Sequence, residues 1–137
     1  MMRRVGFRGE TDGGENDPAD DWHLRSEWPA SVCKDPAVQA AVAILAIDSF
    51  VGPATMRANQ HDLDGEWPVT MPSLDLTSWF YRPEAGCQAR EWLRTRTSVP
   101  ATGACYAVGR TQVWAGDVLM AEGMSQVALI TTPAAST

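Results

Sequence analysis

The chain has 137 residues, enough for one domain with one hydrophobic core and too few for two domains of ordinary size. Hydrophobic residues make up 45% and charged residues 20%, as is typical of soluble globular proteins. The formal net charge of -6 argues against a broad nucleic-acid-binding surface, because such a surface needs a basic stripe to neutralise phosphates. A few arginines that bind one phosphorylated ligand remain compatible with this charge.

Cysteine usage and the apolar stretches indicate the compartment. Cys33, Cys87 and Cys105 are widely spaced and odd in number, which fits neither a disulfide framework nor a paired-cysteine metal site. We expect free, buried thiols in a reducing cytosol. Residues 1–8 lack the apolar run of a signal peptide, and the longest apolar stretch, residues 38–47, is too short to span a bilayer. We therefore expect a soluble cytoplasmic protein without membrane contacts.

The first part of the chain predicts two short strands and a loop. Apolar and polar residues alternate over residues 3–8 and 22–28, which is the pattern of half-buried strands. Between them, residues 9–21 are rich in Gly, Asp, Glu and Asn and have no apolar periodicity, so we expect a mobile acidic loop there.

One strong helix follows. Asp35 is suited to the N-cap position, and Pro36 is suited to the first helical turn. Residues 37–50 are mainly Ala, Val, Ile and Leu and are apolar nearly all round, which predicts burial on most sides. We expect Gly52-Pro53 to end or break this helix.

From residue 69 onward the apolar pattern has period two, which predicts strands. The first of them places Leu74, Leu76, Ser78 and Phe80 on one face and Ser73, Asp75, Thr77, Trp79 and Tyr81 on the other. Further strands are predicted at residues 91–99, 104–114 and 118–130, with turns at 82–86, 100–103 and 115–117. Residues 131–137 are expected to fray.

A single apolar helix thus precedes four successive antiparallel strands. A helix that is buried on most sides needs a sheet that curls around it. We therefore predict one α+β domain over residues 1–137 with the hotdog arrangement, a curved antiparallel sheet wrapped around the helix. An open α+β sandwich, with the helix packed on one face of the sheet, is the alternative that the pattern leaves open.

Three stretches carry a recognisable family pattern, at residues 46–50 (AIDSF), 72–83 (PSLDLTSWFYRP) and 118–129 (VLMAEGMSQVAL). Together with Trp92-Leu93 and Val113-Trp114, they resemble the thioesterase-like superfamily of medium-chain acyl-CoA thioesterases, the acyl-CoA thioesterase II type. Chains of that type carry two hotdog repeats, and this sequence is similar to the C-terminal repeat alone. The resemblance implies hydrolysis of a fatty or related acyl-CoA to free acid and coenzyme A, with no cofactor.

The resemblance also implies an active site. In the family it consists of an aspartate on the hotdog helix, a threonine or serine that opens the next strand, and a glutamine in the last strand. Matching by motif places these residues at Asp48, Ser73 and Gln126. The carboxylate would activate a water molecule as general base, and the hydroxyl and carboxamide would orient that water. Each residue alone has an ordinary structural explanation, so the hypothesis depends on their meeting in space.

Four arginines, Arg82, Arg90, Arg94 and Arg96, lie close together in the sequence. Arginine binds phosphate through its forked donors, so Arg82, Arg94 and Arg96 are candidates for binding the phosphates of coenzyme A. A solvated strand face is the ordinary alternative. Trp79 is a candidate for lining the acyl-chain site, with core packing as its alternative.

Two other functions compete with hydrolysis. Hotdog hydratases and dehydratases usually pair a catalytic histidine with an aspartate on or near the helix, whereas His23 and His61 lie outside the predicted helix. Neither histidine has a companion at metal-ligand spacing, so no metal site is predicted. The second alternative is a non-catalytic subunit that binds acyl-CoA or is purely structural.

A lone hotdog repeat leaves one sheet edge and one side of its helix uncovered, and exposed edges are usually paired or covered. We therefore expect an isologous homodimer, or a partner chain that carries the missing repeat. Acyl-CoA is the expected small-molecule partner.

Overall fold

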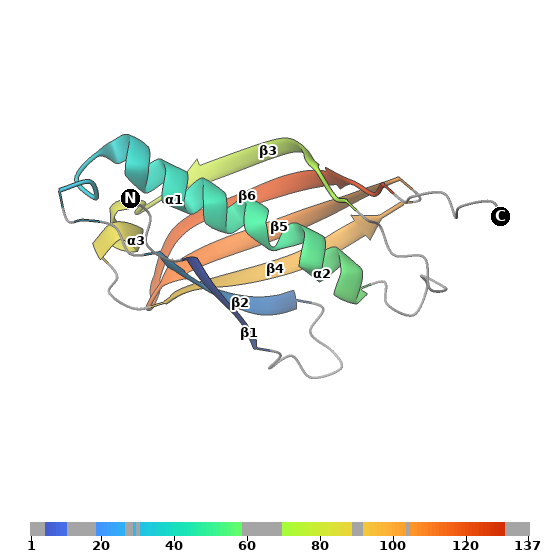
Figure 1. Cartoon of the computed structure of the whole chain (residues 1–137), viewed down its shortest axis with the longest axis horizontal. Coiled ribbons are helices and arrows are strands. Elements are labelled where there is room, and N and C mark those ends of the chain that lie inside the picture. The colour runs from blue at the N-terminus through green and yellow to red at the C-terminus, as the bar shows by residue number, and fades with distance from the viewer. Residues whose placement is uncertain are drawn as a thin grey trace.

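The computed structural model describes residues 5–10, 19–26, 29, 31–58, 70–88, 92–103 and 105–130. These ranges contain the strands and helices labelled in Figure 1. The elements are β1 (Val5–Glu10), β2 (Ala19–Ser26), α1 (Pro36–Ser49), α2 (Val51–Ala58), β3 (Ser73–Phe80), α3 (Glu84–Gln88), β4 (Leu93–Thr102), β5 (Tyr106–Ala115) and β6 (Val118–Ala128).

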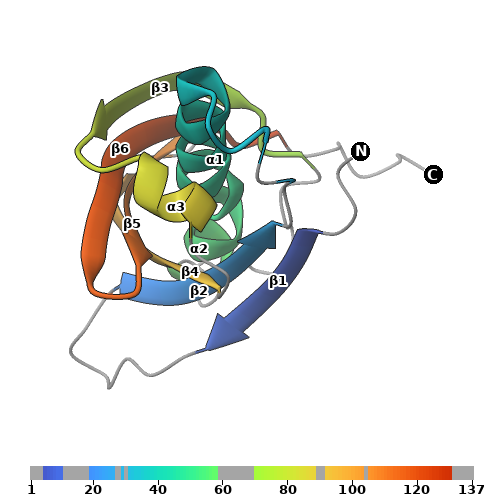
Figure 2. The same cartoon turned by 90° about the vertical axis from the view of Figure 1, so that its left-hand side faces the viewer.

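In the described ranges, six strands form one antiparallel sheet in the order β1-β2-β4-β5-β6-β3. Helices α1 and α2 follow one another along the concave side of this sheet (Figure 1). Viewed from the end, the sheet curls around the helices, with β3 and β2 on opposite sides of them (Figure 2). The predicted single α+β hotdog is therefore confirmed, and the open sandwich is wrong.

The helix begins as predicted and breaks earlier than predicted. The Asp35 carboxylate accepts a hydrogen bond of 2.9 Å from the backbone N–H two residues later, and Pro36 occupies the first turn. Pro53 lacks an N–H, and a proline ring inside a continuous helix collides with the carbonyl four residues earlier, here that of Ser49. The chain therefore leaves the helix at Phe50 and resumes it as α2, where Pro53 falls in the first turn.

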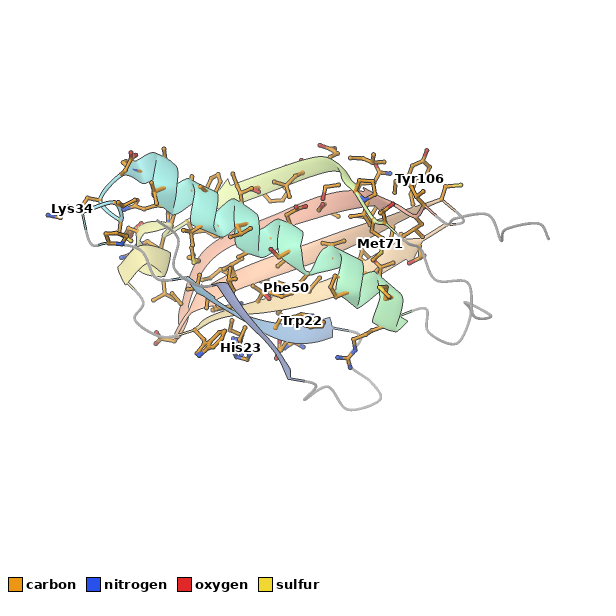
Figure 3. The ribbon with its side chains drawn as sticks, in the orientation of Figure 1. Trp22, His23, Lys34, Phe50, Met71 and Tyr106 are labelled. Atoms are coloured by element: carbon orange, nitrogen blue, oxygen red, sulfur yellow. The ribbon has the colours of Figure 1, made fainter. Side chains whose placement is uncertain are left out.

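The hydrophobic core fills the space between the helices and the sheet. Phe50, at the helix break, stacks on Trp22 of β2 with ring centroids 5.3 Å apart (Figure 3). The buried members of the main cluster come from α1, from the helix break and from four strands. They are Leu24, Val42, Ala43, Ala46, Ile47, Phe50, Leu93, Val113, Met120 and Ala121. Within this chain α1 is buried on one side, while Ile44 is 39% exposed, so the predicted burial on most sides is wrong here.

Two glycines let the helices approach the sheet closely. A Cβ at Gly123 would lie 2.6 Å from the carbonyl oxygen of Thr77 and 2.9 Å from the side chain of Ile47 in α1. A Cβ at Gly109 would lie 2.5 Å from α2. Real Cβ contacts are not this short, so the present helix position requires glycine at both places. Because Ile47 precedes Asp48, packing at Gly123 also sets how near Asp48 lies to the sheet.

The two helices together, Pro36–Ala58, are long and apolar enough to cross a membrane by length and composition, with a mean hydropathy of 1.6. The sequence expectation considered only residues 38–47 and is corrected on this point. In the structure 44% of the most apolar window is buried inside the protein, where the sheet curls around it. Packing in the core of the protein therefore explains the length and apolar composition of this helical segment.

Several boundaries differ from the prediction near the termini. β1 and β2 extend into residues 9–10 and 19–21, where the sequence predicts the acidic loop. The remainder of that loop, residues 11–18, and the tail at 131–137 lie outside the described ranges. Antiparallel pairing between β1 and β2 continues to Glu10 and Asp21, which explains why polar residues there are extended.

β4 also departs from the prediction, because it continues through Pro100 to Thr102 where the sequence predicts a turn. The pairing with β5 shifts register between Ser98 and Ala101, and such an irregularity accommodates a proline that cannot donate to the ladder. The predicted buried thiols are corrected at Cys105, which is exposed, while Cys33 is half-buried.

Candidate active site

Which residues can lie near the helices depends on which face of the sheet each strand residue points to. We call the concave face that packs on α1 and α2 the inner face, and the opposite one the outer face. Along β6, Gly123, Ser125 and Val127 are buried, whereas Met124 and Gln126 are exposed or half-buried. Since successive strand residues point to opposite faces, the buried set defines the inner face.

Asp48 lies in the last turn of α1, next to the helix break, and is half-buried. Its Oδ1 atom accepts a hydrogen bond from the Ser73 hydroxyl of β3 at 2.5 Å. The same atom accepts a second hydrogen bond from the Ser125 hydroxyl of β6 at 3.3 Å. A carboxylate from a mostly apolar helix thus meets hydroxyls from two neighbouring strands.

A β-bulge brings Ser73 to this position. The register of β3 against β6 shifts between Ser73, which pairs with Val127, and Asp75, which pairs with Gln126. Cross-strand partners share a face, so Ser73 lies on the inner face and Asp75 on the outer face. The predicted alternation, which puts Ser73 and Asp75 on one face, is therefore wrong at this point.

Gln126 does not join the site in this chain. It pairs with Asp75 on one side and Val108 on the other, in a row on the outer face, while its neighbour Ser125 faces Asp48. The predicted convergence holds for Asp48 and Ser73 but not for Gln126. A shift of one residue in matching a strand exchanges the two faces, and this is the physical reason for the difference.

Sequence reasoning missed Ser125, although a signal for it exists. Ala121, Gly123, Ser125 and Val127 alternate as small or apolar residues along the last predicted strand. A row of small residues indicates the face on which a helix packs closely, and a hydroxyl in that row faces the helix. In β6 this pattern favours Ser125 over Gln126 as the residue that faces the helix.

The surroundings of Asp48 combine the two hydroxyls with apolar surface. Among the residues that the structure describes, both recorded hydrogen bonds to Asp48 end on Oδ1, so Oδ2 is open to a further donor. Ile44 lies one helical turn before Asp48 and is 39% exposed, and Leu74 follows Ser73 and is 53% exposed. A polar centre with an apolar rim suits a substrate that has a polar reacting group and an apolar chain.

The predicted substrate-binding residues of β3 and β4 lie on the outer face. Leu93, Thr95 and Thr97 are buried, so Arg94 and Arg96 between them point the other way. A cross-strand row joins Arg96, Gln112, Glu122 and Trp79 from four adjacent strands. Within one chain, the sheet therefore separates Arg94, Arg96 and Trp79 from Asp48.

The outer face contains two cavities that share Arg110. One of about 170 Å³ is lined by Arg96, Ser98, Arg110 and Gln112. The other, of about 290 Å³, is lined by Trp79, Tyr81, Arg110, Glu122 and Met124. Charges on this face are engaged with neighbours: Arg110 forms an ion pair with Glu122, and the Arg94 guanidinium lies 5.5 Å from the centre of the Trp114 ring.

Arg82 lies just beyond the end of β3 and pairs locally. Its Nε donates to the Glu84 carboxylate at 2.5 Å. This hydrogen bond from Arg82 lowers the pKa of the Glu84 carboxyl below its ordinary value. Arg90, the fourth arginine of the predicted group, lies outside the described residues.

The described part of the chain holds no group of three His, Cys, Asp or Glu side chains placed to bind a metal ion. The site at Asp48 has one carboxylate and two hydroxyls, a set suited to holding and deprotonating water.

The acyl-CoA thioesterase C-terminal domain family matches residues 3–130 of the chain. The chain belongs to this family. No protein of curated function matches this family member in sequence. The family match supports thioesterase activity in general.

Solved structures of thioesterases share the fold of this family member. A candidate thioesterase from Syntrophus aciditrophicus SB has 19% sequence identity and a TM-score of 0.69, with 92% of this chain and 84% of that chain covered. A thioesterase family protein from Silicibacter pomeroyi has 12% identity and a TM-score of 0.61, with 93% and 86% covered. A candidate thioesterase from Novosphingobium aromaticivorans DSM 12444 has 19% identity and a TM-score of 0.60, with 91% of this chain but 42% of that chain covered.

Proposed function

We propose that the chain hydrolyses acyl-CoA thioesters to free acid and coenzyme A, with Asp48 as the general base. The observation that supports this most directly is the meeting of the Asp48 carboxylate with the hydroxyls of Ser73 and Ser125. The family match supports thioester hydrolysis, and the apolar rim at Ile44 and Leu74 suits an acyl chain.

In the proposed reaction, a water molecule donates a hydrogen bond to Oδ2 of Asp48, the carboxylate oxygen that the two serines leave open. The carboxylate accepts the proton as the water oxygen attacks the thioester carbonyl carbon. The tetrahedral intermediate then expels the coenzyme A sulfur, which takes up a proton and leaves as the thiol. Ser73 is exposed at the mouth of the site, where its hydroxyl orients Asp48 and meets incoming substrate.

The direct test is a thiol-release assay over acyl-CoA substrates from short to long chains, on protein of known oligomeric state. We expect turnover with at least one chain length and its loss in Asp48→Asn. Calorimetric binding of a non-hydrolysable acyl-CoA analogue should persist in Asp48→Asn, because the substitution removes a base and keeps the shape. Absence of thiol release from a folded wild-type protein with every chain length would contradict the proposal.

One observation favours a second candidate, a subunit that binds acyl-CoA without hydrolysing it. The glutamine that the family resemblance implies lies on the outer face, so the site contains a second serine where a carboxamide is expected. A hydroxyl reaches less far than a carboxamide toward a bound water. The two candidates separate in the same experiment, since a binding subunit shows analogue binding by calorimetry together with no thiol release.

We also propose that two copies pair along β3 and α1. β3 is an edge strand, and in the described ranges no strand pairs with it on the side away from β6. Exposed apolar side chains border this edge on both elements, namely Ile44, Leu74 and Phe80. The Novosphingobium aromaticivorans chain, of which this chain covers 42%, has room for a second unit of this size. Light scattering should give twice the chain mass, and Leu74→Asp should shift it toward the monomer.

A further inference from the structure

We propose that Ser125, and not Gln126, is the third functional residue of the site, and that it positions Asp48 by holding its Oδ1 atom. This inference rests on the proposed hydrolysis and specifies how its base is oriented. Nothing in the family resemblance assigns a role to this serine, because the resemblance implies a glutamine in the last strand.

Burial is the first argument. Ser125 is 1% exposed and lies in an inner-face row between Gly109 of β5 and Leu76 of β3. A buried hydroxyl needs a partner, since leaving it unbonded has a desolvation cost. The Asp48 carboxylate, 3.3 Å away, provides the acceptor.

The second argument is that both serines bond to the same carboxylate oxygen. The Ser73 hydroxyl approaches Oδ1 from the exposed edge strand, and the Ser125 hydroxyl approaches it from the buried strand beside it. Two donors from different directions fix the rotation of the carboxylate about its last side-chain bond. Oδ2 of Asp48 is then directed to one place, which orients the base toward a single water position.

The third argument concerns how Ser125 comes within reach of the helix. Gly123, two residues earlier on the same face, brings α1 so close that a Cβ there would lie 2.9 Å from Ile47. At this separation a short serine side chain spans the gap to Asp48. A side chain as long as glutamine is therefore not needed for contact with Asp48. The close helix approach that Gly123 allows is what lets a residue as short as Ser125 reach Asp48.

The test compares Ser125→Ala with Gln126→Ala in the thiol-release assay, and uses Ser98→Ala on the outer face as a neutral serine control. We expect Ser125→Ala to lower kcat about tenfold, the low end for losing a hydrogen bond to a charged group, with KM within about twofold. Gln126→Ala and Ser98→Ala should leave both constants within about twofold of the wild type.

A structural role alone would not produce the next result. In an Asp48→Asn background, Ser125→Ala should cause no further loss of kcat, because residues that act through one another are not additive. A loss of kcat in Gln126→Ala with none in Ser125→Ala would overturn the inference and keep the hydrolase. The inference would also be overturned if Ser125→Ala lowered kcat by the same factor in the Asp48→Asn background as in the wild type. A folded wild type without any thiol release would overturn the proposed function itself, and this role with it.

Discussion

The inner and outer faces of the sheet both carry polar side chains, yet they differ in what those side chains bind. On the outer face, Arg110 pairs with Glu122 and Arg94 stacks on Trp114, so charge meets charge or ring within the sheet. On the inner face, hydroxyls converge on a single carboxylate from the helix. Polarity alone therefore does not separate the two faces. The proposal assigns the chemistry to the inner face because the Asp48 carboxylate there is held by neutral donors and left open on one oxygen.

The largest difference in kcat between the two faces is expected when one carboxylate on each face is replaced by its amide. Asp48→Asn should lower kcat by about 10²- to 10⁴-fold, the usual contribution of a general base. Glu122→Gln, on the outer face, should leave kcat within about twofold and weaken only its pair with Arg110. Steady-state thiol release checks both. Equal losses in the two variants would show that the faces do not differ in function.

The next largest effect concerns the distance between α1 and the inner face. Gly123→Ala should destabilise the fold by about 1–3 kcal/mol, because the added Cβ would overlap Ile47 and the Thr77 backbone. Chemical denaturation measures the loss. Gly103→Ala is the matched control, since its Cβ would have only a distant neighbour at 3.8 Å. If both variants unfold at the same denaturant concentration, the close helix approach is not a constraint.

A smaller effect is expected for the exposed hydroxyl. Ser73→Ala should lower kcat about tenfold through loss of its bond to Asp48, while Ser73→Thr keeps the hydroxyl and should recover most of that loss. Thr77→Ala on the outer side of the same strand serves as the control. Thiol release by all three variants decides the matter, and a defect in Ser73→Thr equal to that of Ser73→Ala would argue against a role for the hydroxyl.

The outer-face arginines should matter less still. Arg94→Ala combined with Arg96→Ala should leave kcat and KM within about twofold, because the sheet lies between these residues and Asp48 in one chain. The stability effect of Arg94→Ala alone should be about 0.5–1 kcal/mol, the usual size of an exposed cation–π contact. A large rise in KM would instead support the role in coenzyme A binding that the sequence suggests for Arg94 and Arg96.

The smallest effect concerns the pair of Arg82 and Glu84. Because the hydrogen bond from Arg82 lowers the pKa of Glu84, the pair stabilises the fold above the carboxyl's unfolded-state pKa. That contribution is lost as pH falls through the lowered folded-state pKa. Glu84→Gln should therefore reduce the melting temperature slightly near neutral pH and less at acid pH. A difference from the wild type that grows on acidification would reverse this sign.

The fold was predictable from the sequence, and so was the meeting of two candidate site residues. The apolar helix with its cap at Asp35 and the period-two strands after it specify a sheet wrapped around a helix. The family resemblance, and not the pattern alone, named Asp48 and Ser73, and the structure brings these two side chains together at the end of the helix and the start of the next strand.

Face assignment was not predictable in the same way. The inner face contains Thr95, Thr97 and Thr111, so polar and apolar positions do not alternate cleanly and either set of residues in β4 resembles a solvated face. The bulge between Ser73 and Asp75 has no mark in the sequence, and it places Ser73 on the face opposite to Asp75. In β6, separately, a one-residue error in matching the motif exchanges Gln126 for Ser125, since strand side chains have a period of two.

The placement of the reacting group itself tests the inner-face site most directly. A crystal structure with a non-hydrolysable acyl-CoA analogue would locate the carbonyl carbon of the analogue. We expect it on the inner side of the sheet, about 3–3.5 Å from a water bound to Oδ2 of Asp48, which is the separation of reacting atoms in productive complexes. A carbonyl seated against Trp79 and Arg96 on the outer face would contradict the assignment of the chemistry to Asp48.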